Sequence, residues 1–126
     1  MRRFGRHYTP EEANALLPRI RTWLGRLRLL QPVFDEHARS LAPRLAQGQD
    51  LGGSRVHAWV RTWLLVRDLQ AEFTSREIQV RDLDRGLIDF PSLRGDREVF
   101  LCWEDGEENV EFWHELEAGI AGRSPL

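Results

Sequence analysis

The sequence predicts an α+β fold: an antiparallel, coiled-coil-like two-helix hairpin with a small antiparallel β-sheet of three to four strands at one end. Apolar residues recur at spacings of three and four through the first half of the chain, which is typical of helices. In much of the second half they alternate with polar residues, which is typical of strands. We expect a single domain over residues 1–126, with the hairpin in 9–75 and a β-meander with a glycine-rich C-terminal segment in 76–126.

The first predicted helix begins after Thr9. This threonine precedes Pro10 and stands three positions before Glu12, which is the pattern of a capping box with proline at the first helical position. An apolar seam with heptad-like spacing then runs from Ala13 to Leu45. Three prolines interrupt it: Pro18, Pro32 and Pro43. Because the seam keeps its phase across all three, we predict bends or short breaks, with helical structure continuing beyond each.

A glycine-containing loop over residues 48–54 separates this helix from a second one, predicted from about Arg55 to Phe73. Antiparallel packing about the loop places Gln31 opposite Gln70, the polar residues of the two seams. Either their amides hydrogen-bond across the hairpin and fix its register, or both reach solvent. The first turns of the first helix extend beyond the second one, so they must pack against the C-terminal half.

The predicted strands follow a change of period after Glu77. Turn-forming dipeptides and glycines separate four short segments, which are centred on residues 78–80, 87–90, 98–104 and 110–114. The last segment has an alternative interpretation as a helix, because Glu111, His114 and Glu115 would then share one face.

The composition excludes several classes of protein. The longest apolar run has five residues, far below the ~18 that a membrane-spanning helix needs. No apolar signal-peptide core follows the basic N-terminus, so we expect a soluble, cytoplasmic protein without membrane association. The single cysteine, Cys102, excludes an internal disulfide and a zinc site built from several cysteines.

Charge is distributed unevenly along the chain. Residues 1–63 carry 11 arginines and 5 acidic residues, whereas residues 64–126 carry 7 arginines and 15 acidic residues. The two halves are therefore expected to attract each other, within the fold or between subunits. A basic helical stripe is present, but no nucleic-acid-binding motif accompanies it and the net charge is −2, so nucleic acid is not an expected partner.

Several ordered motifs extend through the chain. They are Glu11-Glu12-Ala13-Asn14-Ala15-Leu16-Leu17-Pro18, Gly86-Leu87-Ile88-Asp89-Phe90-Pro91, Leu101-Cys102-Trp103, Gly106-Glu107 and Trp113-His114-Glu115, followed by Gly119 and Gly122-Arg123. With these motifs the chain resembles the uncharacterised bacterial family catalogued as domain of unknown function 2203. The resemblance covers nearly the whole chain and implies a small cytosolic protein of two long helices and a short sheet, with no established activity.

Four residues of the predicted sheet can ligate a metal or move protons: Asp89, Glu107, His114 and Glu115. One imidazole with carboxylates suits a divalent ion such as Zn²⁺, Mn²⁺ or Fe²⁺. Structural interpretations stay open as well. Asp89 can accept backbone N–H groups, His114 can be a hydrogen-bonded core histidine, and Glu115 can pair with an arginine. Cys102, between apolar neighbours, is expected to be a buried and inert thiol.

These observations favour a non-enzymatic interaction or oligomerising module, working as a homodimer or with another protein partner. The reason is that the two-helix seam is wider than one partner helix can cover. The competing hypothesis is a metal-binding protein or small metal-dependent hydrolase with the four sheet residues at its centre.

Overall fold

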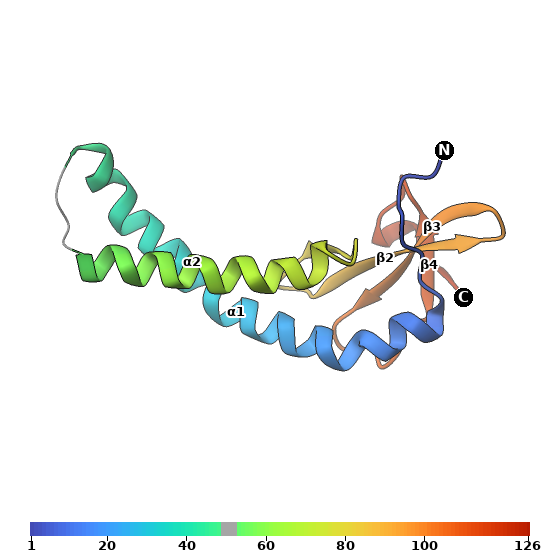
Figure 1. Ribbon diagram of the computed structural model, residues 1–126. Coiled ribbons are helices and arrows are strands. Elements are labelled where there is room, and N and C mark those ends of the chain that lie inside the picture. Colours follow the sequence, from blue (N-terminus) through green and yellow to red (C-terminus); the bar gives the residue numbers. More distant parts are fainter. Residues whose placement is uncertain (49–52) are drawn as a thin grey trace.

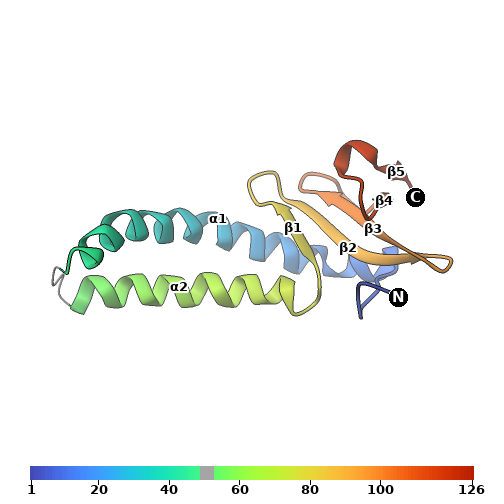
Figure 2. The ribbon, with the colours of Figure 1, turned by 90° about the horizontal axis from the view of Figure 1, so that it is seen from above.

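A computed structural model describes residues 1–48 and 53–126, and it confirms the predicted fold class. Two long helices pack together, α1 (Pro10–Ala46) and α2 (Gly53–Thr74), and an antiparallel sheet of five strands lies at one end of the hairpin (Figure 1). Seen from above, the helices run side by side away from the sheet (Figure 2). Residues 49–52, in the middle of the predicted glycine loop, lie outside the described residues.

The predicted capping box starts α1. Glu12 N donates to Thr9 Oγ1 at 3.1 Å, and Thr9 N donates to Glu12 Oε1 at 2.9 Å. The three prolines lie inside this helix without ending it. Figure 1 shows α1 changing direction between its blue N-terminal part and its cyan-to-green C-terminal part. The helix therefore tolerates the lost backbone hydrogen bonds by bending, as the unbroken seam predicts.

The sheet has the strand order β1-β2-β3-β4-β5. Its strands are β1 (Gln79–Asp82), β2 (Leu87–Arg94), β3 (Arg97–Glu104), β4 (Phe112–Glu115) and β5 (Ser124–Pro125). The segment around His114 is thus a strand, and the helical alternative is wrong. The fifth strand was not predicted because its two residues are too short to show any alternation.

One face of the sheet packs against the start of α1. Its buried side chains from β2 and β3 form one core with side chains of both helices: Ala13, Leu17, Ile20, Leu24, Phe73, Ile88, Phe90, Leu101 and Trp103. The sheet therefore covers the turns of α1 that extend beyond α2, as the sequence requires. The cluster joins helices and sheet into a continuous core.

Arg28 ties α1 to the acidic turns at the edge of the sheet. Its guanidinium donates to the carbonyl oxygens of Leu83 and Asp84 at 3.1 and 3.2 Å, and to Asp105 Oδ2 at 2.8 Å. The basic half of the chain thus attracts the acidic half within one molecule. This contact accounts for part of the charge asymmetry of the sequence.

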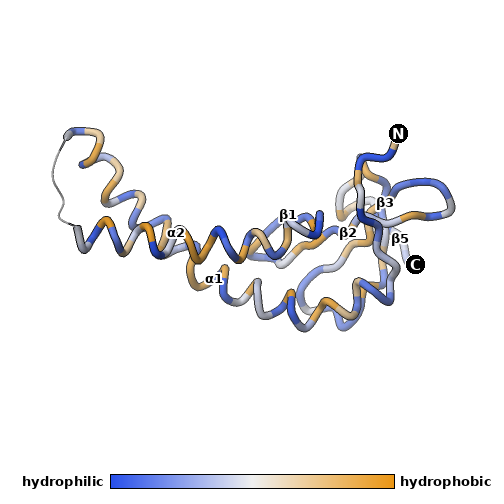
Figure 3. The backbone as a smooth tube through the Cα atoms, in the orientation of Figure 1, coloured by the Kyte–Doolittle hydropathy of each residue, from blue (hydrophilic) through white to orange (hydrophobic). Residues whose placement is uncertain are grey.

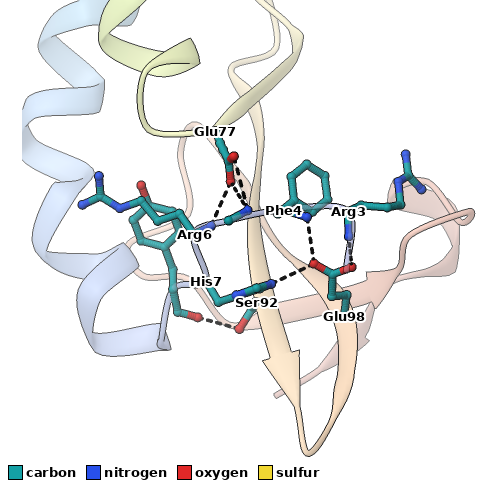
Figure 4. A network of polar contacts seen from close by, with 9 residues as sticks. Arg3, Phe4, Arg6, His7, Glu77, Ser92 and Glu98 are labelled. Carbon is teal, nitrogen blue, oxygen red and sulfur yellow. Dashed lines mark hydrogen bonds and ion pairs between the residues drawn. The ribbon is translucent and has the colours of Figure 1, made fainter. Parts of the chain in front are cut away.

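Two buried or half-buried carboxylates hold the N-terminal segment on the sheet (Figure 4). Glu98 accepts from the backbone N–H groups of residues 3 and 4 at 2.6 and 3.0 Å, and its Oε2 lies 2.8 Å from His7 Nε2. Glu77 accepts from the backbone N–H groups of residues 5 and 6 at 3.0 and 2.9 Å. Burial raises the pKa of Glu98, but these hydrogen bonds outweigh it and lower the pKa to about 2.

Gln31 and Gln70 line one cavity of about 760 Å³ between the hairpin and β1. The Gln31 amide donates to Asp35 Oδ1 on its own helix at 3.2 Å. A hydrogen bond between the two glutamines is not formed in the part of the chain that the structure describes. The predicted pairing of the two glutamines therefore does not fix the hairpin register in the described residues.

Candidate functional site

Three polar side chains meet on the face of the sheet that points away from the core. Asp89 of β2 pairs with Cys102 of β3, and His114 of β4 pairs with Phe100, two residues before Cys102. Since alternate residues of a strand share a face, the three side chains lie on the same side of the sheet. Their side-chain ligand atoms all lie within 4.8 Å of one another. We call them the Asp–Cys–His cluster.

The hydrogen bonds of His114 determine where its protons lie. Nδ1 lies 2.7 Å from the carbonyl oxygen of Glu115, and a carbonyl only accepts, so Nδ1 carries a proton. Nε2 lies 3.0 Å from Asp89 Oδ1, which is a hydrogen-bond distance. A hydrogen bond between these two atoms requires a second proton, carried by either the nitrogen or the oxygen. The pair therefore shares one proton within the cluster.

The cluster is buried although it lies on the outer face. Asp89, Cys102 and His114 are 3%, 0% and 2% exposed. Arg81 Nε donates to Asp89 Oδ2 at 3.0 Å, and its guanidinium lies 5.0 Å from the centre of the Phe100 ring.

The N-terminal segment completes this cover. The ring of Phe4 packs edge-on against Phe100 at 5.4 Å between ring centres, and Phe100 lies 5.6 Å from the His114 ring. Phe4 in turn is held in place through its backbone N–H, which donates to Glu98. The cover is therefore built from residues far apart in the sequence.

Cys102 is not an activated nucleophile. Burial raises the pKa of its thiol to about 12, and the nearby Asp89 carboxylate acts in the same direction. Both nitrogens of His114 are engaged by oxygen atoms, so the imidazole is not available as a base for the thiol. The predicted burial of Cys102 is confirmed.

Only two of the four predicted metal ligands come together. Asp89 and His114 are in the cluster, whereas Glu107 and Glu115 pair with arginines. Both carboxylate oxygens of Glu107 accept from Arg123, at 3.1 and 2.8 Å, and Glu115 Oε1 lies 2.9 Å from Arg97. Cys102, the third member, was interpreted from the sequence as an inert buried thiol and was therefore left out of the predicted ligands. The available signal was that Cys102 lies on the same face of the sheet as Asp89 and His114 in the strand register. The apolar residues on either side of Cys102 in the sequence made it look like a core residue.

A second candidate surface lies on one side of the hairpin. It contains positions i, i+3, i+4 and i+7 of each helix, which share one helix face, and we call it the hairpin face: Arg26, Leu29, Leu30 and Val33 of α1, with Leu65, Asp68, Leu69 and Glu72 of α2. Six of these residues, together with Trp23, line a groove of about 420 Å³. Leu29 and Leu65 are 75% and 52% exposed.

Comparison with known proteins gives a family and no further relative. A family model described as an uncharacterized conserved protein (DUF2203) matches residues 6–126. No curated protein and no solved structure matches the chain. In the described residues, neither helix has a stretch that is long and apolar enough to cross a membrane.

Proposed function

The chain belongs to the DUF2203 family of uncharacterised conserved proteins, and we propose that it is a non-enzymatic self-association module whose helical hairpin pairs with the hairpin of a second copy. The observation that carries this proposal is the hairpin face, an apolar strip in which Leu29, Val33 and Leu65 are exposed and Leu30 and Leu69 are half-buried. Such strips mark protein interaction sites more often than scattered exposed leucines do.

Helix α2 buries few of its apolar side chains. In α2 the buried residues are Thr62, Val66 and Phe73, in a helix of 22 residues. Hydrophobic positions recur along both helices beyond the sheet (Figure 3). Exposed leucine and valine side chains gain about 1.5–3 kcal/mol each when they are fully buried, so a partner that covers this face gains apolar contact at several positions.

The charges around the groove favour a second copy as the partner. Arg26 lies on α1, whereas Asp68 and Glu72 lie on α2, and all three residues line the same groove. A twofold axis parallel to the helices would place α1 of each copy over α2 of the other. Arg26 of each copy then meets the acidic pair of its neighbour, which makes the surface self-complementary.

The competing hypothesis of a metal-dependent hydrolase has less support. Hydrolysis needs a metal position that substrate can reach, with room beside it. The Asp–Cys–His cluster is at most 3% exposed, and none of its members lines either of the two cavities described above. A divalent ion of the zinc, manganese or iron type would therefore support the fold there and would have no access to substrate.

Sedimentation velocity across the micromolar range tests the proposal on the full chain. We expect the average mass to rise from one copy towards two. The L65E variant places a carboxylate in the apolar strip and is expected to raise the dissociation constant by a factor of at least about 30, the equivalent of about 2 kcal/mol.

V60E is the matched control. Val60 is an exposed apolar residue of α2 at 44%, close to the 52% of Leu65, but it is not part of the hairpin face. We expect V60E to associate as the unmodified chain does. A mass of one copy at every concentration, or equal weakening by both variants, would overturn the proposal.

A further inference from the structure

We propose that Asp89, Cys102 and His114 bind one divalent transition-metal ion, Zn²⁺ in the first instance, inside the outer face of the sheet. This site goes beyond self-association and includes Cys102, which the sequence predicts to be an inert buried thiol. The geometry that carries it is the convergence of a carboxylate, a thiol and an imidazole within 4.8 Å, on three adjacent strands.

The donor atoms select the kind of ion. Zinc accepts nitrogen, sulfur and carboxylate oxygen together, whereas magnesium and calcium take oxygen ligands alone. A thiolate also favours zinc over manganese. Three protein ligands leave one position of a tetrahedral ion for a water molecule.

His114 is already oriented as a ligand. Histidines that bind metals usually donate their other ring N–H to a carbonyl or carboxylate, which fixes the tautomer. Here Nδ1–H donates to the Glu115 carbonyl, so Nε2 faces Asp89 and the interior of the cluster. The acceptor is a backbone carbonyl of the strand, so it stays in place whatever the side chain at position 115.

The exchange of protons for metal leaves the buried charge unchanged. One Zn²⁺ enters and forms bonds to Nε2, to an Asp89 oxygen and to Sγ, and two protons leave. One is the proton shared by His114 and Asp89, and the other is the thiol proton of Cys102. No group is oxidised or reduced. The two positive charges of Zn²⁺ replace those of the two protons, so the net charge of the buried site does not change. A change in buried net charge is the main obstacle to burying an ion, and here it is avoided.

The distances require small adjustments in both directions, because the closest pair of ligand atoms must widen and the widest pair must come together. Ligand atoms around tetrahedral zinc lie about 3.3–3.6 Å apart, given bonds of about 2.0–2.3 Å. Asp89 Oδ1 and His114 Nε2 are 3.0 Å apart, and the widest separation in the cluster is within 4.8 Å. A shift of about 1 Å in the Cys102 or Asp89 side chain therefore suffices. Arg81, whose side chain is 44% exposed, lies over Asp89 and must move for the ion to enter.

Cobalt titration of the full chain, freed of metal beforehand, tests the site without any substitution. Co²⁺ replaces zinc and gives a thiolate-to-cobalt charge-transfer absorption, which reports directly on Cys102 as the single cysteine. We expect this band to saturate at one ion per chain and to disappear when zinc is added. Calorimetry of zinc binding in buffers of different ionisation enthalpy should give about two protons released per ion.

Two variants complete the test. C102S should abolish the band and lower zinc affinity at least about tenfold, while tryptophan fluorescence confirms the fold. E115Q changes a carboxylate next to His114 that pairs with Arg97, and it should bind as the unmodified chain does. The proposal is overturned by the absence of a thiolate band at millimolar cobalt. It is equally overturned if C102S binds zinc undiminished, or if E115Q alone loses binding, since each would place the ion elsewhere.

Discussion

Gly86 is the position at which a single methyl group should do most damage to the junction between helix and sheet. Its φ of +66° lies in the left-handed region, and a Cβ there would lie 2.5 Å from Asp105 Cβ and 2.7 Å from Arg28 Nη2. Both neighbours belong to the contact that ties α1 to the sheet. Gly95 offers a matched control, because its φ is +61° and nothing lies within 4 Å of its Cβ position.

G86A and G95A share the cost of a left-handed backbone conformation, and only G86A also has the cost of a steric clash. An alanine in the left-handed region costs about 1–2 kcal/mol, and its reduced freedom in the unfolded chain offsets about 0.4–1 kcal/mol of this. G95A should therefore lower the free energy of unfolding by about 1 kcal/mol. G86A adds an overpacking cost of about 1–3 kcal/mol as Asp105 and Arg28 are displaced. We expect a total of about 3 kcal/mol, or about 2 kcal/mol more than G95A.

Urea unfolding followed by tryptophan fluorescence measures the difference, with buried Trp103 as an intrinsic reporter. The slopes of the two transitions should be equal, so that a shift in midpoint reports stability. If G86A and G95A agree within about 0.5 kcal/mol, the tight contact of Gly86 with Arg28 and Asp105 is not a feature of the folded protein.

Three further predictions concern other contacts. Because the pKa of Glu98 is lowered from 4.5 to about 2, its carboxylate stabilises the fold above pH 4.5, and this stabilisation is lost as the pH falls towards about 2. E98Q should therefore lower the melting temperature at pH 7. It should also make the fall of the melting temperature between pH 4.5 and about 2 less steep. E117Q removes the charge of an exposed partner of Arg3 and should change neither the melting temperature at pH 7 nor its dependence on acid pH. If E117Q changed both as much as E98Q does, the stabilising role of Glu98 would be contradicted. D89N should cost about 3 kcal/mol in urea unfolding because it leaves His114 without its buried anion, and a loss below about 1 kcal/mol would refute this. T9A should remove the capping box at a cost of about 1 kcal/mol, seen as a lower midpoint with an unchanged slope.

The elements that the sequence predicted well are those whose signals are local. The capping box at Thr9 depends on a few neighbouring residues, and the helical period depends on spacings of three and four. Strands β2 and β3 were also predicted, and both form, although most of their residues are buried on both faces of the sheet. Even the three prolines of α1 were interpretable, because the seam keeps its phase across them.

The remaining features depend on contacts between distant segments. β5 exists because Ser124 and Pro125 pair with β4, and two residues carry no periodic signal. Glu107 looked like a metal ligand, but Arg123 occupies both of its oxygens. Cys102 resembled a plain core residue. Its partners come from β2 and β4, and only the strand register places it beside them.

The central claim is that the hairpin face pairs with itself, and mixing two charge-altered chains tests it most directly. R26E and the double variant D68R/E72R should each fail to self-associate, because like charges then meet across the twofold axis. Mixed together they should form a one-to-one dimer, since both opposite-charge contacts are restored, and native mass spectrometry with one chain isotope-labelled would detect it. Association of each variant alone at the affinity of the unmodified chain, or a mixture that stays monomeric, would contradict the account.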